Sequence, residues 1–96
     1  MKGKDLIKLL KDLDIDISED EPIFPLNIAC ELLNLHYWTL HELFKEGIIK
    51  PHGKGKKKKL LSYYDMKLLK YVKYLIEEKG VNIKGVKAIL EIERKI

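Results

Sequence analysis

The stretch LNIACELLNLHYWTLHELFKEGIIKPHGKGKKKKLL, residues 26–61, decides the fold. Apolar residues recur at helical spacing in its first part, and Asn34 follows, a residue that tolerates the left-handed backbone of a helix-ending turn. A second helix is predicted from about Tyr37 to Glu46, and Gly47 is expected to end it. Two short helices joined by a tight turn indicate a helix-turn-helix, a unit that docks on duplex DNA.

A lysine-rich hairpin is expected directly after the second helix. A short strand is predicted at Ile48–Lys50, a turn at Gly53–Gly55 and a return strand at Lys57–Leu61, while Pro51 restricts the hairpin to a sheet edge. Edge strands also carry lysines to block aggregation, but one or two would serve that purpose. Each lysine can neutralise one phosphate, so the candidate phosphate-binding residues are Lys50, Lys54, Lys56, Lys57, Lys58 and Lys59.

The outward face of the second helix is the candidate for contact with base edges. Tyr37, Trp38, His41 and Lys45 are its predicted DNA-binding residues, and Glu42 is expected on the same side. The face lacks arginine, which is the commonest guanine reader. Tyr and Trp side chains could pack against sugars or a thymine methyl group, but Trp38 could equally pack against the N-terminal helix or the linker after it.

The flanking sequence divides into supporting parts. Residues 1–21 are predicted to form an amphipathic helix and an acidic linker, and Pro22–Pro25 an extended lead-in to the domain at 22–91. Ser62 and Asp65 have the spacing of a capping box that opens the longest helix, from about Tyr63 to Lys79.

A last helix follows, with Asn82 as its predicted N-cap. It is expected to run to the end of the chain, so that residues 92–96 form the start of a truncated C-terminal helix. The fold class predicted is therefore mainly α: a winged helix-turn-helix with a short β-hairpin wing and a C-terminal helix pair.

Charge is segregated along the chain. Residues 1–48 hold five lysines and ten acidic residues, a net of −5, whereas residues 49–96 hold fourteen basic and five acidic residues, a net of +9. The basic half is expected to face a polyanion. No apolar run approaches the roughly 20 residues of a membrane span, so a cytoplasmic, nucleoid-associated protein without a membrane partner is expected.

Catalysis finds little support in the sequence. The lone cysteine, Cys30, sits among apolar residues and is predicted to be a small buried core residue rather than a reactive thiol. His36 and His41 lie five apart, which does not place them on one helical face as a metal pair. No enzyme activity, metal or cofactor is expected.

The same residues resemble a known family. Residues 23–91 resemble the DNA-binding domain of MerR-family transcription regulators, and His36 together with the segment after Gly80 looks most similar to the HspR heat-shock repressor branch. The similarity runs in order through Ile28–Leu35, Thr39–Leu40, Lys45–Pro51, Gly55–Asp65, Leu68–Leu69 and Gly80–Val86 with Leu90.

This resemblance implies a winged helix-turn-helix with two further helices, bound to a palindromic operator as a homodimer. Members of the HspR branch repress chaperone genes with a chaperone as corepressor. The chain departs from the family pattern at His41, where arginine is usual, at Leu43, where an aromatic residue is usual, and at the wing, where Lys59 and Leu61 replace an Arg-x-Tyr pattern. Family contacts carry over only to the wing lysines and the start of the second helix.

Two other functions fit the residues. The arginine-free, aromatic face of the second helix and the acidic N-terminal half would suit a protein–protein adaptor on the same fold. Small winged helices of this type also include excisionase-like architectural proteins that bend DNA. The primary hypothesis is a DNA-binding transcriptional regulator, most simply a repressor, with double-stranded DNA as its partner.

Overall fold

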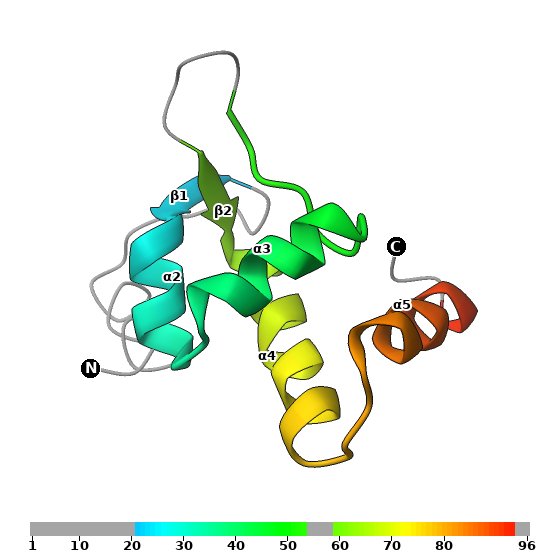
Figure 1. Cartoon of the computed structure of the whole chain (residues 1–96). Coiled ribbons are helices and arrows are strands. Elements are labelled where there is room, and N and C mark those ends of the chain that lie inside the picture. The colour runs from blue at the N-terminus through cyan, green and yellow to red at the C-terminus, as the bar shows by residue number, and fades with distance from the viewer. Residues whose placement is uncertain (1–20, 54–58, 94–96) are drawn as a thin grey trace.

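Four helices and two short strands make up the described part of the chain. The computed structural model describes residues 21–53 and 59–93 (Figure 1). The N-terminal helix and nearly all of the acidic linker predicted at 1–21 lie outside these ranges and stay predictions. In chain order the elements are β1 (Pro22–Pro25), α2 (Leu26–Leu33), α3 (Tyr37–Lys45), β2 (Leu60–Ser62), α4 (Tyr63–Glu77) and α5 (Ile83–Ile92). The predicted fold class, a mainly α winged helix-turn-helix, is confirmed.

The turn between α2 and α3 forms as the sequence predicts. Asn34 adopts φ 51° and ψ 49°, in the left-handed region. The Leu35 amide donates to the Cys30 carbonyl at 2.9 Å and the Asn34 amide donates to the Glu31 carbonyl at 3.2 Å. This pair of bonds is a Schellman motif, which satisfies carbonyls at the end of α2 and reverses the chain.

The C-terminus of α3 ends in the same type of turn, with glycine as the left-handed residue. Gly47 has φ 73°, and the Ile48 amide donates to the Leu43 carbonyl at 3.0 Å. This turn brings Ile48 and Ile49, 2% and 4% exposed, into the core. The strand predicted at Ile48–Lys50 is therefore wrong, because the Ile48 amide is used in the turn that ends α3 and these residues pair with no strand.

The partner of β2 is instead the segment predicted only as an extended lead-in. β1 pairs antiparallel with β2, with Phe24 opposite Leu61 and Pro25 opposite Leu60. The two prolines of β1 are compatible with a sheet of only two strands, because each strand has an unpaired edge. The return strand lies at Leu60–Ser62, at the C-terminal end of the range predicted for it, and residues 57 and 58 lie outside the described ranges.

Side-chain caps begin α4 and α5 at the predicted residues. The Asp65 amide donates to Ser62 Oγ at 3.1 Å, and the Ser62 amide donates to Asp65 Oδ2 at 2.9 Å, which completes the capping box. The Gly85 amide donates to Asn82 Oδ1 at 2.7 Å. Helix α5 ends at Ile92, and residues 94–96 lie outside the described part, so the further helix predicted from 92 stays a prediction.

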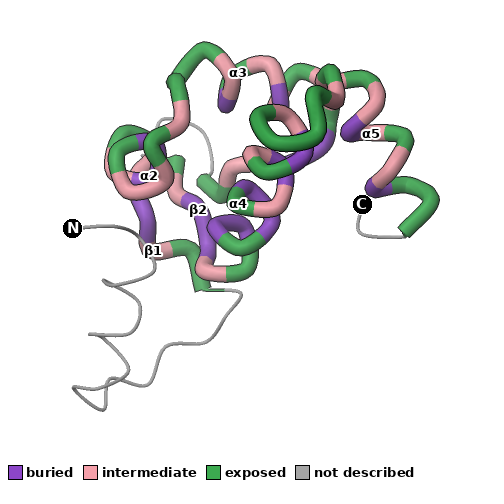
Figure 2. Tube along the Cα trace, turned by 90° about the horizontal axis from the view of Figure 1, so that it is seen from below, coloured by how far each residue is buried: buried purple, intermediate pink, exposed green. Residues whose placement is uncertain are grey.

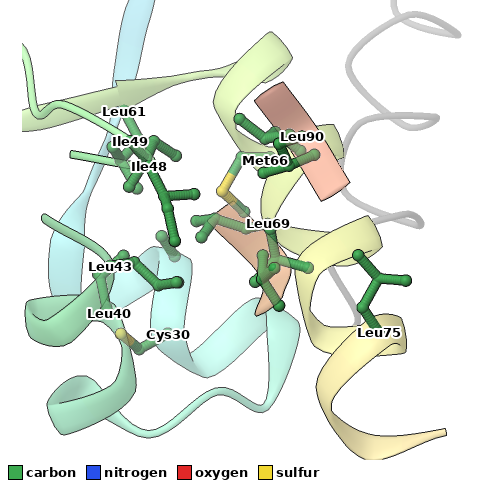
Figure 3. Packing of buried hydrophobic residues seen from close by; sticks show 14 of the residues in the cluster. Cys30, Leu40, Leu43, Ile48, Ile49, Leu61, Met66, Leu69, Leu75 and Leu90 are labelled. Carbon is green, nitrogen blue, oxygen red and sulfur yellow. The ribbon is translucent and has the colours of Figure 1, made fainter. Parts of the chain in front are cut away.

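The core lies between α2, α3, α4 and α5, and the strands close one end of it. Buried positions line the inner sides of these elements (Figure 2), and the side chains of Leu43 and Leu69 point into a common interior (Figure 3). The largest fully buried side chains are Leu40, Leu43, Ile48, Leu61, Leu69, Val72, Val86 and Leu90. Cys30 belongs to this cluster, as predicted.

Lys73 of α4 joins the helix-turn-helix to the rest of the domain. Its Nζ donates to the Leu33 carbonyl at 2.8 Å, at the C-terminus of α2. Glu77 lies one turn along α4 and pairs with Lys73 at 3.7 Å. A cation is favourable at this end of α2, because the unpaired carbonyls there carry partial negative charge.

We expect Lys73→Met to lower the free energy of unfolding by about 1–2 kcal/mol, since it keeps the aliphatic stem but removes the donor to Leu33. Chemical denaturation followed by circular dichroism measures this loss. The exposed Lys70→Met variant on the same helix is the matched control, and Glu77→Gln should lose less than about 0.5 kcal/mol. Equal losses for Lys73→Met and Lys70→Met would contradict the assignment.

Candidate nucleic-acid interface

Helix α3 separates an exposed polar and aromatic face from a buried apolar one. Leu40 and Leu43 are 0% exposed and fix the rotation of the helix about its axis. Tyr37, His41 and Lys45, at intervals of four residues, all lie on the exposed side. The helical period therefore brings three of the four predicted α3 contacts into one row.

Trp38, the fourth predicted contact, stands next to this row and is 69% exposed, while Tyr37 is 57% exposed. The N-terminal helix and nearly all of the linker, its alternative packing partners, lie outside the described residues, so that alternative stays a prediction. Glu42 is half-buried, so its carboxylate is less prominent on this face than the sequence suggests. The face thus offers a phenol, an indole N–H, an imidazole and an ammonium group, all of which can donate hydrogen bonds.

The N-terminus of α3 adds backbone donors to the same end of the face. His36 is the N-cap residue, but its side chain makes no capping hydrogen bond. The first amides of a helix have no carbonyl partner within the helix, and they carry partial positive charge. The start of α3 is therefore suited to face an anionic group.

The wing begins and ends beside α4. His52 and Leu60 form an antiparallel bridge in which each amide donates to the other residue's carbonyl at 2.8 Å. Lys50 and Lys59 are both exposed, one on each side of this bridge. Lys54, Lys56, Lys57 and Lys58 lie outside the described residues, so their positions stay predictions.

A side-chain contact that the sequence did not reveal holds the base of the wing. His52 Nε2 lies 3.0 Å from Asp65 Oδ2, on the first turn of α4. The same oxygen accepts the Ser62 amide of the capping box. The capping spacing identified Asp65 as a cap, but no local pattern connects it with a histidine thirteen positions away.

Residues 24–92 match the family described as MerR HTH family regulatory proteins. The chain belongs to this family. The MerR match covers most of the chain and agrees closely with the resemblance predicted for residues 23–91. The family is one of regulatory proteins and not a class of enzymes.

The chain is also similar in sequence to a curated protein. The Streptomyces coelicolor protein described as "Putative heat shock protein HspR" is 30% identical over 81 residues, which are 84% of this chain and 54% of the relative. The chain therefore spans about half the length of the relative. The predicted similarity to the HspR branch is confirmed.

The described part of this MerR domain shows neither a metal cluster nor a membrane-spanning helix, and its cysteine is buried. Within residues 21–53 and 59–93, no three His, Cys, Asp or Glu side chains lie together as a metal site would require. Burial raises the pKa of the Cys30 thiol, which disfavours the reactive thiolate. No helix among the described residues is long and apolar enough to cross a bilayer.

We expect Cys30 to react with iodoacetamide at pH 8 at least about tenfold more slowly in the folded protein than in urea, because its raised pKa and its burial both limit attack. Mass spectrometry measures the rate directly, since the chain has 1 cysteine. Equal rates in the two conditions would show that the thiol is accessible in the folded protein.

Proposed function

We propose that this protein is a DNA-binding transcriptional regulator whose α3 enters the major groove while the lysine-rich wing contacts phosphates. The observation that carries the proposal is the row of exposed donors on α3, held by a helix-turn-helix whose wing base is flanked by Lys50 and Lys59. Membership in the MerR family supports the proposal.

Helix α3 would read the groove through unusual side chains. Tyr37 and Trp38 present apolar ring faces that suit a thymine methyl group or a sugar, and His41 can donate to a base acceptor. Lys45, at the far end of the same row, would reach a guanine edge or a phosphate. The uncapped amides at the start of α3 would hold a backbone phosphate next to these readers.

The wing would supply most of the electrostatic attraction. Lys54, Lys56, Lys57 and Lys58 are encoded between the two ends of the wing, and Lys50 and Lys59 extend the basic segment on either side. Lysine acts as a point charge that binds phosphate without distinguishing bases. Affinity should therefore depend steeply on salt, and specificity should come from α3.

We also propose that the protein represses its target genes as a homodimer in the cytoplasm, associated with the nucleoid. The exposed Ile92, 81% accessible near the end of α5, supports burial against a second copy. Similarity to the protein described as a putative heat shock protein HspR supports a chaperone as corepressor. Enrichment of sequences from a random duplex pool tests DNA binding and dimerisation together, because a dimer should select a palindrome.

We expect the triple variant Lys56→Ala, Lys57→Ala, Lys58→Ala to lose affinity for every duplex alike and to lower the slope of log K against log salt by about 2–3. Fluorescence anisotropy with a labelled duplex at several salt concentrations measures both quantities. The charge-matched control neutralises Lys70 on α4, Lys79 in the turn after α4 and Lys87 on α5, and it should change the slope by less than about 1. Equal slope changes in the two triple variants would reject the wing as the phosphate-binding element.

We expect Trp38→Ala to weaken binding to the selected sequence by about 1–3 kcal/mol while leaving the salt slope unchanged, because the indole carries no charge. Competition between the selected duplex and a scrambled duplex measures the loss of discrimination. A uniform loss on both duplexes would assign Trp38 to general packing on the DNA.

A protein–protein adaptor is the second candidate, and the exposure of Trp38 and Tyr37 favours it. Such an adaptor would form a protein complex that is sensitive to Trp38→Ala and insensitive to the triple wing variant. Binding of the wild-type protein to duplex DNA at low salt, with loss on neutralising the wing, would exclude this alternative.

A further inference from the structure

The two ends of the wing are attached to the domain in different ways. On the return side, Leu60 continues directly into β2, which pairs with β1 and leads into α4. The outgoing side, residues 50–53, follows the buried pair Ile48 and Ile49 and lies outside both strands of the sheet. Within the described residues, the hydrogen bonds that hold this side are the backbone bridge with Leu60 and the bond of the His52 side chain.

The backbone bridge alone does not orient the wing. Two hydrogen bonds join His52 to Leu60, which is paired with Pro25 on its other side, but this single bridge holds the outgoing side of the wing at one residue only. A contact from the wing to a helix is needed to fix the wing against the helical body. The bond from His52 Nε2 to Asp65 Oδ2 is such a contact, since Asp65 belongs to the first turn of α4.

The chemistry of this bond sets the role of each partner. The Asp65 carboxylate already accepts the Ser62 amide, so it serves as an acceptor here and the histidine donates from Nε2. The Asp65 side chain is 12% exposed and the His52 side chain is 45% exposed. The acceptor is thus held rigidly by its helix cap, while the donor stands at the surface where the wing departs.

We propose that His52 is a positioning residue for DNA binding: its bond to Asp65 fixes the base of the wing to α4, and the lysines encoded between the two ends of the wing depend on that attachment for their contribution to affinity. This inference rests on the proposed function. His52 acts through the wing lysines, so its contribution to affinity exists only while those lysines are present.

A double-mutant cycle on duplex binding tests this dependence. The proteins are the full chain, His52→Ala, the triple variant Lys56→Ala, Lys57→Ala, Lys58→Ala, and their combination, all titrated with one labelled duplex at fixed salt. His52→Ala is expected to weaken binding by about tenfold in the otherwise unaltered chain and by less than about twofold in the triple variant. A loss of equal size in both backgrounds would overturn the proposal, because it would mean that His52 acts independently of the wing lysines. No loss in either background would overturn it as well.

Two matched variants separate positioning from damage to the fold. His52→Gln keeps an N–H donor of similar reach and is expected to restore affinity to within about threefold of the unaltered chain. Ser62→Ala weakens the same helix cap without removing His52, and it should lower thermal stability while leaving DNA affinity within about twofold at a temperature where the protein is folded. If Ser62→Ala reduces affinity as much as His52→Ala, the effect belongs to the stability of α4 and the proposal fails.

The same titrations distinguish a failure of the positioning role of His52 from a failure of DNA binding itself. A wild-type chain that binds no duplex at low salt would reject the proposed function and, with it, any positioning for DNA. A wild-type chain that binds, with His52→Ala binding equally well, would reject the positioning role alone.

Discussion

The apolar seam along α4 is the constraint on which the other elements depend. Leu69 and Val72 are 1% and 0% exposed, and α2, α5 and both strands pack against this helix. Fully burying a side chain of this kind contributes about 1.5–3 kcal/mol, so the seam outweighs any single polar contact in the domain. Helix α3 joins the same core through Leu40 and Leu43, which leaves the row of Tyr37, His41 and Lys45 no orientation but outward.

Hydrogen bonds add specific contacts between α4 and the elements around it. Lys73 ties α4 to the end of α2, and the Tyr71 hydroxyl donates to Glu93 at 2.9 Å, where α5 ends. His52 adds the corresponding contact at the base of the wing. Each joins α4 to a different neighbour, so one helix serves as the common reference for the helix-turn-helix, the wing and the C-terminal helix. A movement of α4 relative to α2, α5 or the wing would break one of these three hydrogen bonds.

Local signals made much of this fold predictable from the sequence. Asn34 and Gly47 end helices because few residues adopt left-handed backbone without strain, and Ser62 with Asp65 begins a helix because the capping spacing is short and specific. The exposed row on α3 followed from the helical period alone. The family resemblance placed these elements in the correct order.

Contacts between distant residues were not predictable in the same way. The pairing of β1 with β2 was missed because Pro22–Pro25 carries two prolines and its partner lies beyond the whole helix-turn-helix. Ile48–Lys50 was assigned to a strand because a short apolar run fits a strand and a buried turn equally well. The bonds of Lys73 with Leu33, forty residues away, and of His52 with Asp65 depend on tertiary packing that no local spacing encodes.

The pairing of β1 with β2 also makes the segment ahead of α2 part of the packed core. A fragment that began at Leu26 would contain both helices of the helix-turn-helix and the wing, yet it would leave Leu61 without the Phe24 side chain opposite it. Phe24 is 4% exposed and Leu61 is 0% exposed, so their removal from each other would open the core to water beside the capping box. The folded core therefore includes Pro22–Pro25, ahead of the helix-turn-helix, and this strand pairs with the strand that leads into α4.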